Sequence, residues 1–198
     1  MKRVLVVTGT PGVGKTIISK ALATEISADY VSLTDIVKED NLILGVDKER
    51  DSRIVDIEKL TKRIKDIISS NPKDIVIDGH YAQDVVPSSL VVNVFVLRRN
   101  PEDLKAILKE RGYPVNKILE NVISEILDIC LVDAINNFGI KKVSEIDVSY
   151  LSVEEVLEEI MQIVNGQKPI SVGKVDWLSY LEKGEKLYLL NPISWADH

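Results

Sequence analysis

The sequence predicts an α/β fold of three layers, in which helices flank a central parallel β-sheet. Strand and helix patterns alternate along the chain, which is typical of a parallel sheet covered on both faces. The strand patterns VLVV, DIVID and VVNVFVL are almost continuously apolar, as expected for strands buried on both sides. The chain has 198 residues, of which 45% are hydrophobic, so we expect one domain with a sizeable core.

The first half of the chain contains most of the expected strands. Strands are predicted over residues 3–8, 30–33, 74–77 and 91–97, and helices over residues 15–27 and 56–69. Ligands bind at the carboxyl ends of the strands in such sheets. The residues that follow each strand are therefore the first candidates for a functional site.

The second half is mostly helical. Asn100 can cap a helix that has Pro101 at its first position, and Gly112 ends this helix. Apolar residues at helical spacing then predict one long, deeply buried helix over residues 114–138. The segment KKVSEIDVS is the expected last strand.

A capping box formed by Ser152 and Glu155 starts a final helix that ends near Gly166. The character of the chain changes there, and residues 166–198 are interpreted as a C-terminal extension that contains both tryptophans, Trp177 and Trp195. We expect a flap packed onto the domain. The alternative is an element that docks a partner through its aromatic residues.

Composition excludes several classes of protein. The net charge is −6 and the basic residues are scattered, so direct binding to DNA is not expected. The single cysteine, Cys130, has no partner for an internal disulfide, which fits a reducing compartment. The start of the chain is too short for a signal peptide, and no apolar run is long enough for a membrane span. We expect a cytoplasmic protein without membrane contact.

The segment VTGTPGVGKT carries the strongest functional signal. Gly9, Gly14, Lys15 and Thr16 match the pattern G-x-x-x-x-G-K-[ST], with a predicted strand before it and a helix after it. The glycines let backbone N–H groups wrap a phosphate, and the amino end of the helix adds partial positive charge. Lys15 supplies a cation to the β and γ phosphates, and the Thr16 hydroxyl is a ligand for Mg²⁺. The pattern predicts a P-loop NTPase fold that binds a nucleoside triphosphate with Mg²⁺.

Three further residues are candidates for the catalytic site. Asp78 ends a buried strand within IVIDGHYA and can hold Mg²⁺ through water, although a strand-end aspartate can also cap a turn. His80 can orient or deprotonate a water or position an acceptor, or it is structural. Arg111 can brace the transferred phosphate, or it neutralises the end of its helix. Arg98 and Arg99 compete with Arg111 and rank below it.

Two segments are expected to complete the site. Only a tight turn fits between Arg111 and Pro114, so a short lid is expected over about residues 110–120. Residues 33–55 are interpreted as an insertion that binds a nucleoside monophosphate (NMP). Lys38, Arg50 and Arg53 are its candidate phosphate contacts, with a solvated charged face as the alternative for the last two.

The chain resembles the adenylate kinase isoenzyme 6 type, also called the CINAP-like family, found in archaea and eukaryotic nuclei. The resemblance rests on GTPGVGKT, DGH, VFVLRRNPEDLKAILKERGY and NKILENVISEI, and it covers most of residues 1–165. It implies a broad-specificity NMP kinase that transfers phosphate from Mg-ATP to AMP, with a companion ATPase activity. It also implies a role in maturation of the small ribosomal subunit through a platform ribosomal protein.

The resemblance assigns roles by position. Gly12, Val13, Gly14, Lys15, Thr16 and Ile17 fall on the nucleotide loop, Asp78 and His80 on the Walker-B-like triplet, and Arg111 on the short lid. Three features depart from the family: Lys38 replaces an arginine, Ile17 replaces a second threonine, and the extension has no counterpart. A lysine lacks the bidentate fork of arginine, so AMP phosphate recognition is expected to be weaker.

Two other functions stay open from the sequence. One is a ribosome assembly factor that is driven by ATP hydrolysis and has only incidental kinase activity. The other is a kinase for a different small acceptor. Both keep the nucleotide loop and differ in what receives the phosphate.

Overall fold

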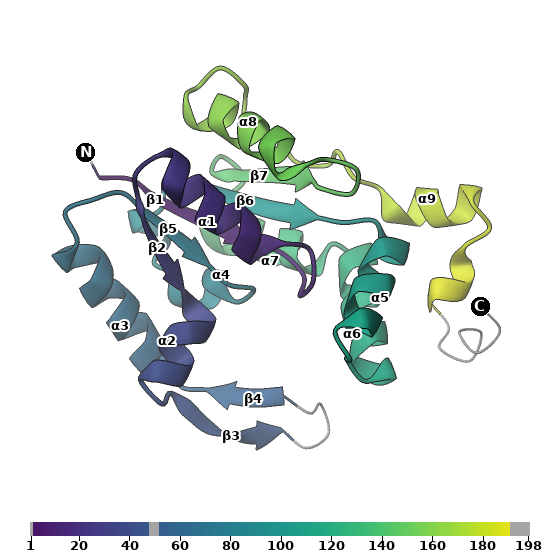
Figure 1. The fold of residues 1–198 in the computed structure, drawn as a ribbon, viewed down its shortest axis with the longest axis horizontal. Coiled ribbons are helices and arrows are strands. Elements are labelled where there is room, and N and C mark those ends of the chain that lie inside the picture. Colours follow the sequence, from purple (N-terminus) through teal and green to yellow (C-terminus); the bar gives the residue numbers. More distant parts are fainter. Residues whose placement is uncertain (1, 48–51, 191–198) are drawn as a thin grey trace.

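A sheet of five parallel strands forms the centre of the protein (Figure 1). It is seen in a computed structural model that describes residues 2–47 and 52–190. The strand order is β2 (Asp29–Ser32), β5 (Ile75–Asp78), β1 (Val4–Thr8), β6 (Asn93–Arg98), β7 (Val143–Asp147). All four neighbouring pairs are parallel, which confirms the predicted α/β fold with a central parallel sheet.

Helices cover both faces of this sheet, because successive residues of each strand point to opposite sides. Leu5 and Val7 lie in one core cluster with residues of α1 (Lys15–Glu25), α5 (Pro101–Glu110), α6 (Val115–Ile126) and α8 (Val153–Val164). Val4 and Val6 lie in a second cluster with residues of α2 (Leu33–Glu39), α3 (Ile57–Ser70), α4 (Ala82–Val85) and α7 (Ile129–Phe138). A 3-10 turn, η1 (Ser88–Leu90), leads into β6. The result is the expected three-layer arrangement.

The prediction of one long helix over residues 114–138 is wrong. The chain forms two helices, α6 and α7, separated at Asp128, whose φ of 58° lies in the left-handed region. Val122 of α6 packs on one face of the sheet and Leu131 of α7 packs on the other. One straight helix cannot reach both faces. Tertiary packing therefore overrides a helical apolar pattern that is continuous in the sequence.

The predicted helix caps are confirmed. The Asn100 side chain accepts a hydrogen bond from the Glu102 N–H at 2.9 Å, and both bonds of the Ser152–Glu155 capping box are present. The short strand predicted over residues 30–33 ends at Ser32, because the Ser32 side chain caps α2 instead.

The insertion over residues 33–55 contains α2 and a two-stranded hairpin of β3 (Ile43–Asp47) and β4 (Ser52–Val55). Figure 1 places this hairpin on the side of α2 away from the sheet, at the same end of the molecule as the far end of α6.

The C-terminal extension packs onto the domain. Its helix α9 (Trp177–Lys183) and 3-10 turn η2 (Leu187–Leu190) lie beside α5 and α6 (Figure 1). Trp177, Leu181 and Leu189 are buried in the same core cluster as α1 and α5. This is the flap expected from the sequence, and Trp195 lies outside the described residues. No helix in the described part of the chain is both long and apolar enough to cross a bilayer.

Candidate active site

The glycine-rich loop connects β1 to α1 and lies close to β6. Gly9 has a φ of 133°, and a Cβ added there would lie 2.5 Å from the carbonyl oxygen of Leu97. Only glycine fits this close approach. Gly14, with a φ of 106°, is the N-cap residue of α1. The loop therefore folds by local rules that the sequence pattern already contains.

The amino end of α1 has the features of an anion-binding site. Among the described residues, no side chain caps this helix, so no side chain competes with a ligand for the N–H groups of its first turn. The Lys15 ammonium donates hydrogen bonds to the carbonyl oxygens of Gly9 (2.9 Å) and Thr10 (3.0 Å) across the loop. Burial lowers the pKa of Lys15, while the nearby Asp78 carboxylate opposes this shift. An incoming phosphate would supply the negative charge that this desolvated ammonium needs.

Asp78 lies beside the loop, because β5 pairs with β1 and Asp78 is in register with Val7. Its carboxylate is 5% exposed and accepts hydrogen bonds from the Thr16 hydroxyl (2.7 Å) and the Tyr30 hydroxyl (3.0 Å). The structure thus brings together Thr16 and Asp78, the two residues expected to hold the metal.

Both groups fit a magnesium ion, since hydroxyl and carboxylate oxygens are ligands that Mg²⁺ accepts, and they face one cavity. When bound, Mg²⁺ would neutralise charge on the phosphates.

Tyr30 was missed by the sequence analysis. It lies in the short strand β2, which pairs with β5, so its hydroxyl reaches the Asp78 carboxylate. Burial, followed by the charge of Asp78, raises the pKa of Tyr30 to about 12. The hydroxyl therefore stays protonated at neutral pH and remains a donor. A tyrosine in a predicted short strand was the signal in the sequence.

Replacing Tyr30 with phenylalanine is expected to lower kcat about tenfold and to raise the Mg²⁺ concentration needed for half-maximal rate, because Asp78 loses a charge-assisted hydrogen bond. The measurement is kcat as a function of MgCl₂ concentration. Tyr150→Phe is the matched control, because Tyr150 is 78% exposed and hydrogen-bonds to Asn100 instead. An unchanged Mg²⁺ dependence in Tyr30→Phe would contradict this role.

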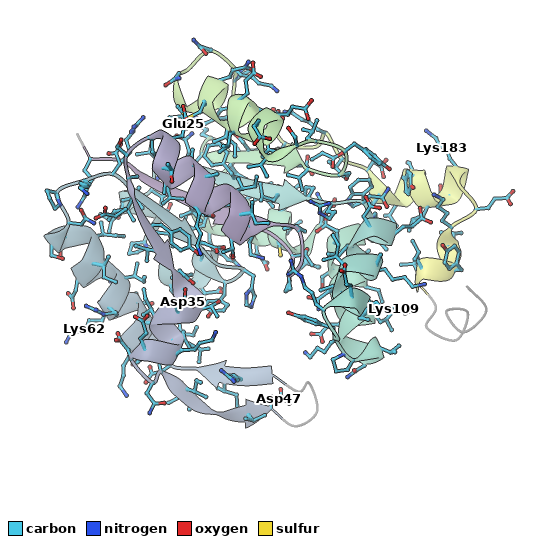
Figure 2. All side chains as sticks on the ribbon, viewed as in Figure 1. Glu25, Asp35, Asp47, Lys62, Lys109 and Lys183 are labelled. Atoms are coloured by element: carbon cyan, nitrogen blue, oxygen red, sulfur yellow. The ribbon has the colours of Figure 1, made fainter. Side chains whose placement is uncertain are left out.

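A cavity of about 420 Å³ joins these groups. The expected site residues that line it are Gly12, Gly14, Lys15, Thr16, Ile17, Asp78, His80 and Arg111. Ser32, Thr34, Asp35 and Tyr113 also line it and were not foreseen. In Figure 2, Asp35 marks the α2 side of the cavity and Lys109 marks helix α5 across from it. The cavity therefore lies between the loop, the insertion and the turn after α5.

Among the described residues, three expected contact residues do not line this cavity. Val13 is fully buried beneath the loop. Lys38 and Arg53 are exposed and are not among the residues that line the cavity. Lys38 is exposed because α2 turns Leu33, Ile36 and Val37 toward the core instead, and Arg53 lies in strand β4 of the hairpin. Arg50 lies outside the described residues. Binding of the acceptor phosphate by Lys38 and Arg53 stays a prediction.

The three candidate arginines lie in different surroundings. Arg111 follows α5 as its C-cap residue and lines the cavity, so it can act there as well as neutralise the helix end. Arg98 is 1% exposed and is bound by Glu125, Glu145 and Asp128. Arg99 donates to the Val13 carbonyl behind the loop at 3.4 Å. Arg111 is therefore the one of these three that faces the cavity.

His80 follows β5 at the mouth of the cavity. The residue is exposed, and its ring meets the Tyr81 ring edge-on, with 4.3 Å between the ring centroids. Desolvation against the cavity wall, followed by the charge of Lys15, lowers the pKa of His80 to about 4. The imidazole is therefore neutral at pH 7 and can accept a proton or a hydrogen bond.

His80 is expected to leave kcat/KM for ATP nearly flat between about pH 5.5 and about pH 8, because the folded protein takes up this proton only near its lowered pKa. The unfolded chain takes it up near the ordinary pKa of 6.5. The stability linked to His80 is thus fully present above pH 6.5 and is lost as the pH falls toward 4. The check is the ratio of kcat/KM between the parent protein and His80→Asn across this range. A step in the ratio near pH 6.5 would contradict the lowered pKa.

This geometry defines a class of protein. A glycine-rich loop between β1 and α1, with a lysine and a threonine at its end and an aspartate on the adjacent strand, makes a P-loop nucleotide-binding protein. A family model described as AAA domain matches residues 5–128, which is more than half of the chain.

Comparison with curated proteins narrows this class. The chain is 40% identical over 173 residues to a protein of Methanocaldococcus jannaschii named "Putative adenylate kinase", covering 87% of this chain and 92% of that protein. A protein of the same name from Pyrococcus abyssi is 38% identical over 178 residues, covering 87% and 90%. The chain therefore belongs to the family of P-loop proteins that includes these archaeal adenylate kinase homologues.

The fold is also seen in a solved structure. Shikimate kinase from Bacteroides thetaiotaomicron superposes with a TM-score of 0.58 at 13% identity, covering 82% of this chain and 98% of that one. At this identity the likeness concerns the fold alone, which is that of a P-loop kinase.

Proposed function

We propose that the protein is an adenylate kinase that converts Mg-ATP and AMP into two ADP. The observation that carries this proposal is the convergence of Lys15, Thr16, Asp78 and Arg111 on one cavity. The relatives named "Putative adenylate kinase" support a nucleotide kinase, and the cavity supports a reaction at the terminal phosphate of a nucleotide bound by the loop.

In the proposed reaction, an oxygen of the AMP phosphate attacks the γ-phosphorus of ATP. The bond to the β–γ bridging oxygen breaks, and ADP leaves with the bonding electron pair. Lys15 and the N–H groups of α1 hold the β and γ phosphates, and Arg111 reaches from the turn after α5 to the charge that develops. Asp78, oriented by Thr16 and Tyr30, would hold the metal. Such catalysis is mostly positioning and electrostatics.

The acceptor is proposed to enter from the side of the insertion. Ser32, Thr34 and Asp35 line the cavity there, and Lys38 and Arg53 lie in the same insertion. The Ser32 and Thr34 hydroxyls on this side can both donate and accept hydrogen bonds, which supports broad acceptor specificity as part of the proposal.

The test is ADP formation from ATP and Mg²⁺ with AMP, CMP, UMP or GMP, or with no acceptor. The proposal expects AMP to give the highest kcat/KM and two ADP for each AMP consumed. A panel in which no monophosphate raises ADP formation above the rate without acceptor would overturn it. A higher rate with an acceptor that is not a nucleotide would instead favour another small-molecule kinase.

A companion ATPase activity is proposed from the short turn. Only Gly112 and Tyr113 separate Arg111 from Pro114, and His80 is exposed at the mouth of the cavity, so water can reach the site. Phosphate release from ATP in the absence of AMP measures this activity. A rate no higher than that without enzyme would refute it.

The cellular role is proposed from the family resemblance to be assistance in small ribosomal subunit maturation, in the cytoplasm, through a platform ribosomal protein. The partner would then be bound while ATP is hydrolysed. A binding assay with the purified small-subunit platform protein, with and without Mg-ATP, tests this. Absence of binding under both conditions would refute the ribosomal role and leave only the proposed enzymatic activity.

A further inference from the structure

One buried carboxylate connects the phosphate loop to the C-terminal extension. Glu125 of α6 is 1% exposed. Its Oε2 accepts a hydrogen bond from the Thr10 hydroxyl at 2.5 Å. Its Oε1 accepts from the Arg98 side chain (2.8 Å), the Arg99 backbone N–H (3.1 Å) and the Trp177 indole N–H (3.1 Å). The loop and the extension thus share one anion, although they lie far apart in the sequence.

The extension supplies donors that this buried cluster needs. Glu145 of β7 is fully buried and also binds Arg98, at 2.5 Å. Its second oxygen accepts from the backbone N–H groups of Lys174 (2.7 Å) and Val175 (3.4 Å) of the extension. Two buried carboxylates therefore face a single buried guanidinium. Buried charge is stable only when it is paired and hydrogen-bonded, so the N–H groups of the extension compensate for the excess negative charge.

Thr10 is the residue through which this cluster acts on the loop. Its carbonyl oxygen accepts from the Lys15 ammonium (3.0 Å) and from the Val13 N–H (3.3 Å). Its hydroxyl is held by Glu125. The position of Thr10 therefore determines both the path of the loop and the place of the lysine that meets the phosphates.

We propose that Trp177 is a positioning residue for the phosphate loop and acts through Glu125 and Thr10. The inference rests on the proposed binding of a nucleoside triphosphate by this loop. Without the indole N–H, Oε1 keeps only donors from residues 98 and 99, and the carboxylate is free to turn toward them and away from Thr10. The loop must then be ordered when the nucleotide binds, which weakens affinity more than turnover.

The test compares two conservative variants in the full chain. Trp177→Phe removes the donor to Glu125 but keeps an aromatic ring in the core. Tyr180→Phe is the matched control, because the Tyr180 hydroxyl fastens the same helix to Glu102 at 2.9 Å without touching Glu125. Binding of Mg-ATP, measured by calorimetry without AMP, is expected to weaken about three- to tenfold in Trp177→Phe. It is expected to change less than about twofold in Tyr180→Phe, and kcat at saturating ATP should stay within about twofold of the parent in both variants.

Other outcomes would overturn the inference. Equal weakening in both variants would mean that loosening of the extension alone is responsible, and no weakening in Trp177→Phe would mean that the shared carboxylate does not act on the loop. In a Thr10→Val background, Trp177→Phe should weaken Mg-ATP binding by less than about twofold, because the hydrogen bond from residue 10 to Glu125 is already absent. If Trp177→Phe weakens Mg-ATP binding as much in that background as in the parent protein, the inference is also overturned.

A measurement on the unmodified protein avoids any dependence on how the variants fold. Coupling between two sites is reciprocal, so Mg-ATP should slow amide hydrogen exchange in the segment from Lys174 to Leu181. Unchanged exchange there, while the loop itself becomes protected, would overturn the inference. The calorimetric binding and the hydrogen-exchange readouts do not require phosphate transfer to AMP. The role of Trp177 and the proposed kinase reaction are therefore tested separately, and a negative result for one does not contradict the other.

Discussion

Lys15→Ala is expected to lower ATP turnover by at least about a hundredfold, because it removes the cation that balances charge on the transferred phosphate. The same variant should bind Mg-ATP more weakly. Its stability should change by no more than about 1 kcal/mol, because burial already disfavours the charged ammonium in the folded protein. ADP formation, calorimetric binding and thermal unfolding measure the three effects separately.

Two further variants sharpen this result. Lys15→Arg keeps the charge, but its planar fork does not fit between the carbonyl oxygens of Gly9 and Thr10, so most of the activity should still be lost. Lys62→Ala removes an exposed cation of α3 and should leave turnover unchanged. Turnover within about tenfold of the parent in Lys15→Ala would show that the loop lysine does not stabilise the transition state.

Arg98→Met is expected to cause the largest loss of stability, about 3–5 kcal/mol, because it leaves Glu125 and Glu145 buried without a counter-charge. For a chain of this size the melting temperature should fall by roughly 6–20 °C. Methionine fills much of the volume of the arginine stem, so the loss reports on charge and not on a cavity. Thermal or urea unfolding measures it.

The control for Arg98→Met is an arginine in an exposed ion pair. Arg63 binds Asp40 at 2.9 Å, with 51% of the Arg63 side chain exposed. Arg63→Met should cost no more than about 1 kcal/mol, because water and salt screen such pairs. Similar losses for the two substitutions would show that the Arg98 cluster is not a buried charge network that folding depends on.

The features of the site that the sequence predicts are those that depend on residues close together in the chain. The path of the loop depends on backbone conformation at Gly9 and Gly14 and on the amino end of the helix that follows, all within a few residues. Asp78 was found because strand ends meet at one edge of a parallel sheet. Lys38 was chosen by charge, but the direction in which α2 presents its side chains depends on which of its residues reach the core. Arg53 was also chosen by charge, and it lies in strand β4 of the hairpin.

The cluster around Glu125 was missed, although a signal was present. Glu125 lies seven residues after Ile118 and three after Val122, on the buried stripe of its helix. An acid at such a position requires a buried cation, and Arg98 ends a buried strand. The sequence pattern alone does not tell that these two meet, since 27 residues separate them.

The amino-acid sequence by itself determined the five strands of the central sheet along the chain, the phosphate loop and the residues at the strand ends, because hydrophobic periodicity and glycine chemistry act over short distances. Only the tertiary structure decided where the chain breaks at Asp128 and that Tyr30 orients Asp78. It also decided that the extension shares the Glu125 carboxylate with the loop. These features depend on contacts between segments that are distant in the sequence, and the free energy of such contacts depends on burial in the folded molecule.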